Sequence, residues 1–220
     1  QTNITYIGAP LDENLIQAVR AKEGINAYNA VLKGEILMQE DLRLIDYNGI
    51  YGDDPIAAHL LSLEAGTDPL LSAAFQTQRV KLAAGEPFGE SGASEALANE
   101  NDLHIGDEIR LSPRKDHSGQ PVTVKISGLF TVEAAQQNTD VAAPVHLLEN
   151  KIFIDITSGR ALMGTAGADY VDFRINDPAQ VNQTIDEIRE TGGIAWSCFL
   201  ITASVEEYEK AAGPLLSIRE

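Results

Sequence analysis

Residues 171–201, VDFRINDPAQVNQTIDEIRETGGIAWSCFLI, decide the fold class of this 220-residue chain. Apolar and polar side chains alternate at the start of the stretch, which is the period-two pattern of a half-buried strand. Asp177 and Pro178 form a typical helix start, and the apolar residues of 181–188 share one face of the helix that follows. Two glycines end this helix before a final apolar run. The stretch therefore predicts a strand–helix–strand unit.

A second unit of this kind is predicted at the start of the chain. Residues 4–7 have the composition of a short strand. Asp12 is a good helix N-cap, the apolar stripe over 15–19 predicts the helix itself, and Gly24 provides its end. A strand-rich stretch over 28–38 completes the second strand–helix–strand unit.

The residues between these units predict a different mixture of elements. We expect a strand over 42–50, a helix that begins at Asp54-Pro55 and ends at Gly66, and a short helical piece over 69–75. The expected helix rests on the helical spacing of Ile56, Leu60 and Leu63.

From residue 79 onward, glycine, serine and proline separate shorter elements. The expected elements are a helix capped by Ser94, a turn at Gly106-Asp107, strands over 108–111, 122–126 and 152–156, an exposed loop over 113–120, and a helix over 159–163. The middle of the chain is therefore predicted to be rich in β-structure.

Together these elements predict an α+β protein of two lobes. A lobe of strand–helix–strand units comprises residues 1–78 and 165–220, and a β-rich lobe of residues 79–164 is inserted into it. Ser204 and Glu207 have the spacing of a capping box, which predicts a helix at the end of the chain.

The charge of the chain excludes one class of partner. Sixteen Lys and Arg residues stand against 33 Asp and Glu residues, which gives a formal net charge of −17. Such a surface repels nucleic-acid phosphates and anionic lipid headgroups, so no nucleic-acid partner is expected. No stretch approaches the ~18 apolar residues that span a bilayer, and no signal peptide opens the chain, whose first residue is Gln1. The single cysteine, Cys198, is expected to be a buried residue of the last strand.

No catalytic residue is predicted from the sequence. The segment Gly89–Ala93 comes nearest to a nucleophile elbow, but alanine stands where the pattern requires its second glycine. We therefore interpret this segment as a flexible surface loop. An enzyme whose active site is assembled from distant residues is the weakest of the alternatives that the sequence leaves open.

No metal or cofactor site is predicted either. The histidines are not spaced as a helical metal pair, and the acidic pairs do not have the spacing of a calcium loop. The residues concerned are His59, His104, His117, His146, Glu40-Asp41 and Asp53-Asp54. Glycine loops that bind phosphate are absent from the sequence, so a function driven by ATP requires a partner that carries the nucleotide site.

The middle of the chain resembles a known family. The segments that carry the resemblance are Val80–Phe88 (VKLAAGEPF), Ala96–Ala98, Leu103–Leu111 (LHIGDEIRL), Val122–Phe130 (VTVKISGLF), Ile152–Asp155 and Leu162–Gly164. In this order and at these distances they are similar to the MacB-like periplasmic core domain of FtsX/MacB-type ABC transporter permeases. Glu86 stands where the family often has a basic residue, and the first 75 residues depart from the common pattern. Gly85, Gly106 and Asp107 are interpreted as turn-forming residues and not as ligands.

The resemblance implies a fold, a location and partners. The fold is a Sabre-like arrangement in which a porter-like lobe carries an inserted β-rich lobe, on the extracytoplasmic face of the cell membrane. Implied partners are an ABC ATPase subunit or domain reached through transmembrane helices, a second permease copy and an adaptor or accessory protein. The implied function is the coupling of ATP-driven transmembrane motion to export or release of a peptide, lipid, lipoprotein or antibiotic, or to signalling outside the membrane.

A different class of function also fits the residues. A free secreted or surface-anchored protein that binds a ligand between two lobes has the same composition and lacks catalytic motifs in the same way. The sequence of the parent gene on either side of this chain separates the two hypotheses.

Overall fold

A computed structural model describes residues 2–6, 11–39, 41–47, 49, 59–87, 91–114, 118–133, 143–192 and 199–203. Its chain divides into two compact units, one of residues 1–30 and 167–220 and one of residues 31–166. Each unit contains strands and helices, so the protein is α+β as predicted. No helix among these residues is long and apolar enough to cross a membrane.

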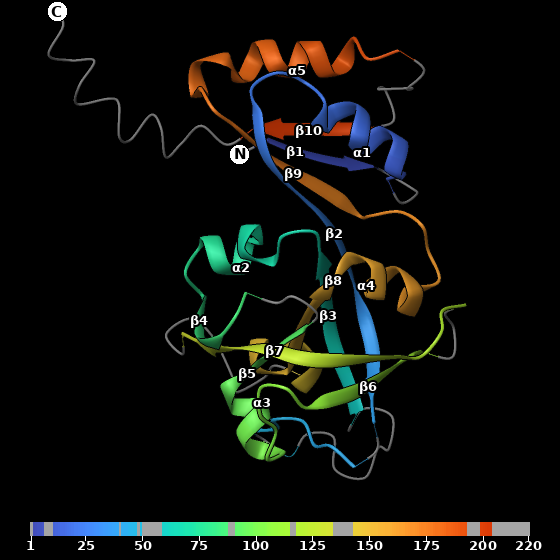
Figure 1. The fold of residues 1–220 in the computed structure, drawn as a ribbon, viewed down its shortest axis with the longest axis vertical. Helices are drawn as coiled ribbons and strands as arrows, with labels where there is room; N and C mark the ends of the chain where they lie inside the picture. The colour runs from blue at the N-terminus through green and yellow to red at the C-terminus, as the bar shows by residue number, and fades with distance from the viewer. Residues whose placement is uncertain are drawn as a thin grey trace, which may run out of the picture. The chain divides into compact units, whose positions relative to one another are not determined.

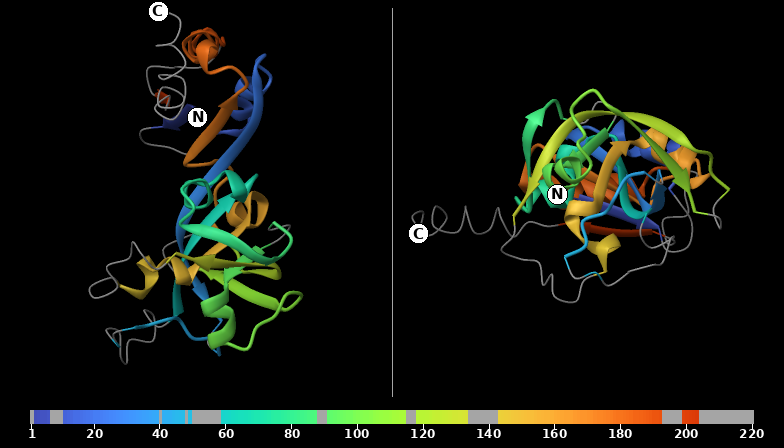
Figure 2. Two further views of the ribbon diagram at one scale, coloured as in Figure 1. Left: turned by 90° about the vertical axis from the view of Figure 1, so that its left-hand side faces the viewer. Right: turned by 90° about the horizontal axis from the view of Figure 1, so that it is seen from below.

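In the described part of the first unit, four strands form a sheet that is accompanied by two α-helices (Figure 1 and Figure 2). Its elements are β1 (Thr2–Tyr6), α1 (Glu13–Arg20), the start of β2 (Ile25–Met38), β9 (Tyr170–Ile175), α5 (Val181–Arg189) and β10 (Phe199–Ala203). The strand order is β10-β1-β9-β2, and β1 runs antiparallel to both β9 and β10. The two strand–helix–strand units, β1-α1-β2 and β9-α5-β10, are thus interleaved. Strand β9 lies between β1 and β2, and strand β1 lies between β9 and β10.

Local sequence explains why the helices of this unit form. The Asp12 side chain accepts a hydrogen bond of 2.8 Å from the Leu15 backbone amide and caps α1, as predicted. The buried face of α1 contributes Ile16 and Val19 to a core that also contains Phe173 of β9. A short 3-10 helix, η6 (Pro178–Gln180), leads into α5. The predicted apolar stripes therefore do face the core.

The second unit contains a closed ring of strands. The ring follows the order β2-β3-β8-β5-β7-β6 and returns to β2, because β6 pairs with both β7 and β2. Its new members are β3 (Leu60–Gly66), β5 (Ser91–Ser94), β6 (Glu108–Pro113), β7 (Val122–Val132) and β8 (Lys151–Asp155), while β4 (Val80–Gly85) pairs with β7 outside the ring. Closure of this kind leaves no free strand edges within the ring itself.

All six strands of the ring contribute side chains to one apolar core. The fully buried members include Ile36, Leu61, Leu111, Ile126 and Ile152. Two short helices also contribute, α3 (Glu95–Glu100) through Leu97 and α4 (Ile156–Met163) through Leu162. The inserted β-rich part of the chain is thus a small barrel filled with side chains.

A second, smaller apolar cluster lies on the outer face of β7 and β8. Phe130 and Phe153 pack edge to face, with ring centroids 5.2 Å apart. Phe75 of α2 (Ala73–Gln76) contacts both rings, and the preceding 3-10 helix η2 (Pro69–Leu71) adds Leu70. These two short helices occupy the helical piece predicted over 69–75.

The segment of residues 42–47, here called the strap, differs from the strand predicted over 42–50. This segment has no regular secondary structure, and side chains hold its backbone. The Asn101 amide bonds both backbone groups of Arg43, at 2.6 and 2.8 Å, and Asn150 does the same for Ile45, at 2.9 and 2.7 Å. An asparagine amide offers the same donor and acceptor pair as a peptide group, so each one replaces a neighbouring strand.

Two other predicted elements are wrong. Residues 60–66 are strand β3 and not the end of a helix, because Leu61, Leu63 and Ala65 face the barrel core while Glu64 faces the other way. Residues 91–93 belong to the buried strand β5 and not to a surface loop. The predicted helix start at Asp54-Pro55, Cys198 and the terminal helix lie outside the described residues.

The boundaries of the two units differ from those expected in one place. The first unit ends at residue 30, within β2, whereas the expected boundary was 78/79. Residues 31–78 belong to the second unit because β2 and β3 are members of the barrel. The return to the first unit falls at 166/167, beside the expected 164/165.

Candidate functional site

The serine of the elbow-like segment is not placed as a nucleophile. Ser91 is buried in β5, and its hydroxyl donates to the Lys125 carbonyl at 2.8 Å. The hydroxyl therefore bonds a backbone oxygen that has no role as a base, and it ties β5 to β7. Gly89 and Glu90 lie outside the described residues.

The histidines do not converge in the described part of the chain. His104 is exposed, with its ring Nδ1 3.7 Å from the Asp107 carboxylate, and His146 is exposed in a 3-10 helix, η4 (Pro144–His146). His59 immediately precedes β3. His117, Glu40 and Asp53-Asp54 lie outside the described residues, and no group of potential metal ligands occurs among those that are described.

The residues interpreted as turn formers do form turns. Gly106 has φ +104°, a conformation that favours glycine, and its amide donates to the Ile126 carbonyl at 2.8 Å. The Asp107 carboxylate accepts from the His104 amide at 2.8 Å and closes the turn before β6. Gly85 has φ +79° at the end of β4. These positions serve the fold, as predicted.

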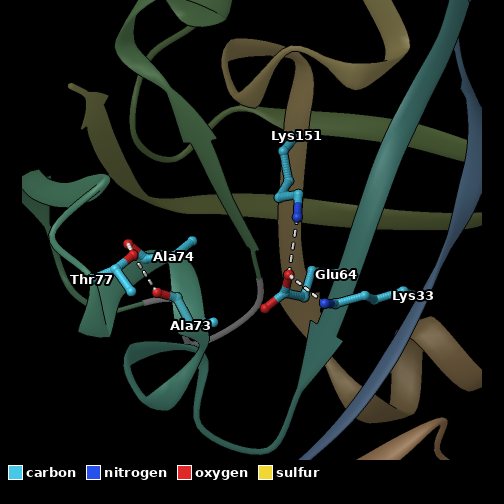
Figure 3. A network of polar contacts seen from close by, with 6 residues as sticks. All are labelled: Lys33, Glu64, Ala73, Ala74, Thr77 and Lys151. Atoms are coloured by element: carbon cyan, nitrogen blue, oxygen red, sulfur yellow. Dashed lines mark hydrogen bonds and ion pairs between the residues drawn. The ribbon is translucent and has the colours of Figure 1, made fainter. Parts of the chain in front are cut away.

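A buried ion cluster lies on the outer face of the barrel (Figure 3). Glu64 of β3 is only 4% exposed, and its carboxylate bonds Lys151 of β8 at 3.0 Å. Lys33 of β2, directly opposite Glu64 in the strand register, approaches the same carboxylate oxygen to 4.0 Å. The cluster thus links three neighbouring strands through one carboxylate.

The cluster is joined to the outer aromatic cluster. The Lys151 ammonium lies 5.7 Å from the centre of the Phe153 ring, within the range of a cation–π contact. Figure 3 shows Glu64 between the two lysines, with α2 beside it. Both lysines thus approach the same Glu64 carboxylate, which links the three strands by charge.

Removal of one member of this cluster is expected to destabilise the second unit. Lys151→Met leaves the buried Glu64 carboxylate with only the more distant Lys33, which is expected to lower the free energy of unfolding by about 2–4 kcal/mol. Adding Glu64→Leu to Lys151→Met removes the poorly paired buried charge and is expected to restore most of the lost free energy of unfolding. Urea unfolding of both variants measures the difference, and a double variant as unstable as Lys151→Met contradicts the interpretation.

A second polar cluster connects the strap to a 3-10 helix, η5 (Leu148–Asn150), which leads into β8. The Tyr47 hydroxyl donates to Oε1 of Glu149 at 3.4 Å. Burial of the hydroxyl end, and then the neighbouring Glu149 carboxylate, raises the pKa of Tyr47, so the phenol stays protonated at neutral pH. Glu149 is only 8% exposed and its Oε2 has no hydrogen-bond partner.

The strap is positioned above Glu149 by the residues around it. The Asn150 side chain bonds the backbone of Ile45, two residues before Tyr47, and also donates to the Pro144 carbonyl at 2.9 Å. The Ser94 hydroxyl donates to the Glu149 carbonyl at 2.6 Å and also caps α3. The backbone on each side of the Tyr47–Glu149 pair is thereby fixed.

No local pattern in the sequence points to either cluster. Glu64 and Lys151 are far apart in the chain, as are Tyr47 and Glu149, and the sequence predicts a chemical role for none of the four. Only the pairing of β3 with β8 and the course of the strap bring them together.

The structure is similar to two solved domains of transport proteins. The extracellular domain of the noncanonic ABC-type transporter YknZ from Gram-positive bacteria matches with a TM-score of 0.56 at 11% identity, over 92% of this chain and 100% of that one. The periplasmic region of MacB from Actinobacillus actinomycetemcomitans matches with a TM-score of 0.57 at 8% identity, over 96% of this chain and 91% of that one. No family model and no curated protein sequence matches the chain.

These likenesses cover both compact units, since each extends over more than nine-tenths of the chain. At such low identity they establish the architecture and not the activity. The chain therefore has the fold of the MacB-like periplasmic core domain, the family that the motifs between Val80 and Gly164 resemble.

Proposed function

We propose that this chain is the extracytoplasmic domain of an ABC transporter permease. The observation that carries the proposal is the match over almost the full length of two such domains, one extracellular and one periplasmic. The ordered motifs over Val80–Gly164 support it independently, because they are features of the amino-acid sequence and do not rest on the fold.

In the proposed mechanism the chain contains no catalytic, metal or cofactor site. An ATPase subunit or domain hydrolyses the nucleotide and moves the transmembrane helices of two permease copies. Those helices move the extracytoplasmic units as rigid bodies, which expels a peptide, lipid, lipoprotein or antibiotic, or signals to an adaptor or accessory protein. The rigid barrel core of the second unit suits it to transmit a displacement without deforming.

Sequencing the parent gene on both sides of the chain tests this proposal. We expect an apolar stretch of about 20 residues before Gln1 and further such stretches after Glu220. A cleavable signal followed by this chain and a stop codon contradicts the permease assignment and favours a free secreted binding protein.

The purified chain provides a second test. Because the nucleotide site belongs to another subunit or domain in this mechanism, we expect no ATP hydrolysis above the rate of a buffer blank. The control is the parent transporter with its ATPase. Hydrolysis by the chain alone contradicts the proposed division of roles.

A further inference from the structure

Glu149 is a buried acid without a cation. Its side chain receives a single hydrogen bond, the 3.4 Å contact from the neutral Tyr47 hydroxyl, which is near the limit for an O–H···O bond. Its other oxygen, Oε2, is buried and has no hydrogen-bond partner among the described residues. Among the described residues, no lysine, arginine or histidine forms an ion pair with it.

The other buried acid of the barrel shows how unusual this is. Glu64, with a similar exposure, also has one buried oxygen without a hydrogen-bond partner, but its other oxygen has Lys151 at 3.0 Å and Lys33 at 4.0 Å. Removing a carboxylate from water is costly unless a cation or several donors compensate for the lost hydration. Among the residues that the structure describes, the Glu149 site lacks this compensation.

Tyr47 places an exposed aromatic ring beside this carboxylate. It is 55% exposed, the highest exposure among the large hydrophobic side chains described. Its contact with Glu149 is long and is formed by a side chain at the surface, so the ring can turn aside without disturbing the core. A carboxylate beside an aromatic ring is the pair of groups that suits a planar guanidinium, which bonds the first and stacks on the second.

We propose that Glu149 and Tyr47 form a receptor for the guanidinium group of an arginine side chain on a partner protein. The arginine donates to both carboxylate oxygens, including the unpaired Oε2, while the Tyr47 ring covers the guanidinium face. The net charge of −17 attracts a basic partner at long range, and this site then fixes one of its side chains. Asn150 acts as a positioning residue, because it holds the strap that carries Tyr47.

The inference does not depend on the permease assignment. All of its residues belong to the second unit, and the test uses the chain itself without membrane helices or ATPase. A failed arginine-binding test therefore leaves the proposed function intact, and the reverse also holds.

The test is an NMR titration of the ¹⁵N-labelled chain with N-acetyl-arginine amide. We expect saturable shifts of the backbone amides of Tyr47, Glu149 and Asn150. N-acetyl-citrulline amide, which has the same shape but no charge, is expected to leave these amides unshifted. Equal shifts with the two probes, or shifts spread evenly over the acidic surface, overturn the proposal.

Matched variants separate this site from general attraction to an acidic protein. Glu149→Gln keeps the shape of the side chain and is expected to weaken binding about tenfold or more, since it removes a charge-assisted hydrogen bond. Glu86→Gln, which makes the same change at an exposed position, is expected to leave binding unchanged. Equal affinity of the Glu149→Gln variant and the parent chain overturns the proposal.

A change at the surface keeps the test decisive if Glu149→Gln fails to fold. Tyr47→Phe retains the ring and is expected to bind the arginine probe at least as well as the parent chain. Tyr47→Ala removes the ring and is expected to bind it severalfold more weakly. If these two variants bind equally, the aromatic part of the receptor is wrong.

Discussion

Phe153→Ala lowers the free energy of unfolding of the second unit by about 3–5 kcal/mol. Phe153 is fully buried and lies at the centre of the outer aromatic cluster, 5.2 Å from the ring centres of both Phe75 and Phe130. Alanine removes both edge-to-face contacts and leaves a cavity between β7, β8 and α2. Urea unfolding followed by far-ultraviolet circular dichroism measures the loss.

Two further variants show whether the loss comes from the cluster. Phe153→Leu fills much of the same volume and is expected to cost less than half as much as alanine. Leu82→Ala, at an exposed position of β4, is expected to change stability by about 0.5 kcal/mol or less. Similar losses for Phe153→Ala and Leu82→Ala contradict the role assigned to the aromatic cluster.

Gly119→Ala is expected to destabilise the second unit by about 2–4 kcal/mol. A Cβ atom at this position lies 1.7 Å from the Leu162 carbonyl oxygen, which is part of the α4 backbone and cannot move away like a side chain. The displaced loop also loses the hydrogen bond of 2.8 Å from the Gln120 amide to the Ala161 carbonyl. The loss appears as a lower urea concentration at the midpoint of unfolding, while the slope of the free energy of unfolding against urea concentration stays unchanged.

The matched control is Gly192→Ala at the end of α5. A Cβ atom there has no neighbour within 4 Å, so the substitution is expected to be neutral or slightly stabilising. If Gly119→Ala is equally neutral, residues 118–120 do not pack against α4 as described.

The parts of the fold that were predicted correctly are those with strong local signals. The caps Asp12 and Ser94 bond the helices that follow them, and the alternating pattern from residue 122 onward forms β7. Gly106 forms the expected turn. In each case the information lies within a few residues, so a local pattern is sufficient.

The wrong predictions share a physical cause. Residues 61–65 alternate apolar and polar side chains as a strand does, while Ile56, Leu60 and Leu63 also have the spacing of one helix face, so the local pattern fits both structures. The sequence of the strap is strand-like, but the strap has no regular secondary structure. What the sequence does not show is that its hydrogen-bond partners are the side chains of Asn101 and Asn150.

The sequence does not reveal the two polar clusters because the members of each cluster are far apart in the chain. Glu64 and Lys151 meet only because β3 and β8 run parallel and adjacent in the sheet. In the chain, strands β4 to β7 lie between them. An unpaired oxygen such as Oε2 of Glu149 is a property of the packed chain and leaves no trace in local composition.

The hydrogen bonds by which the two asparagines hold the strap go to its main chain, which makes position 43 tolerant of chemical replacement. Arg43 is exposed, and neither of its bonds to Asn101 involves its own side chain. An engineered cysteine at position 43 can therefore carry a dye or a spin label while the strap keeps its course. Once the native Cys198 is replaced, that label is the only one on the chain, and it reports on the barrel unit.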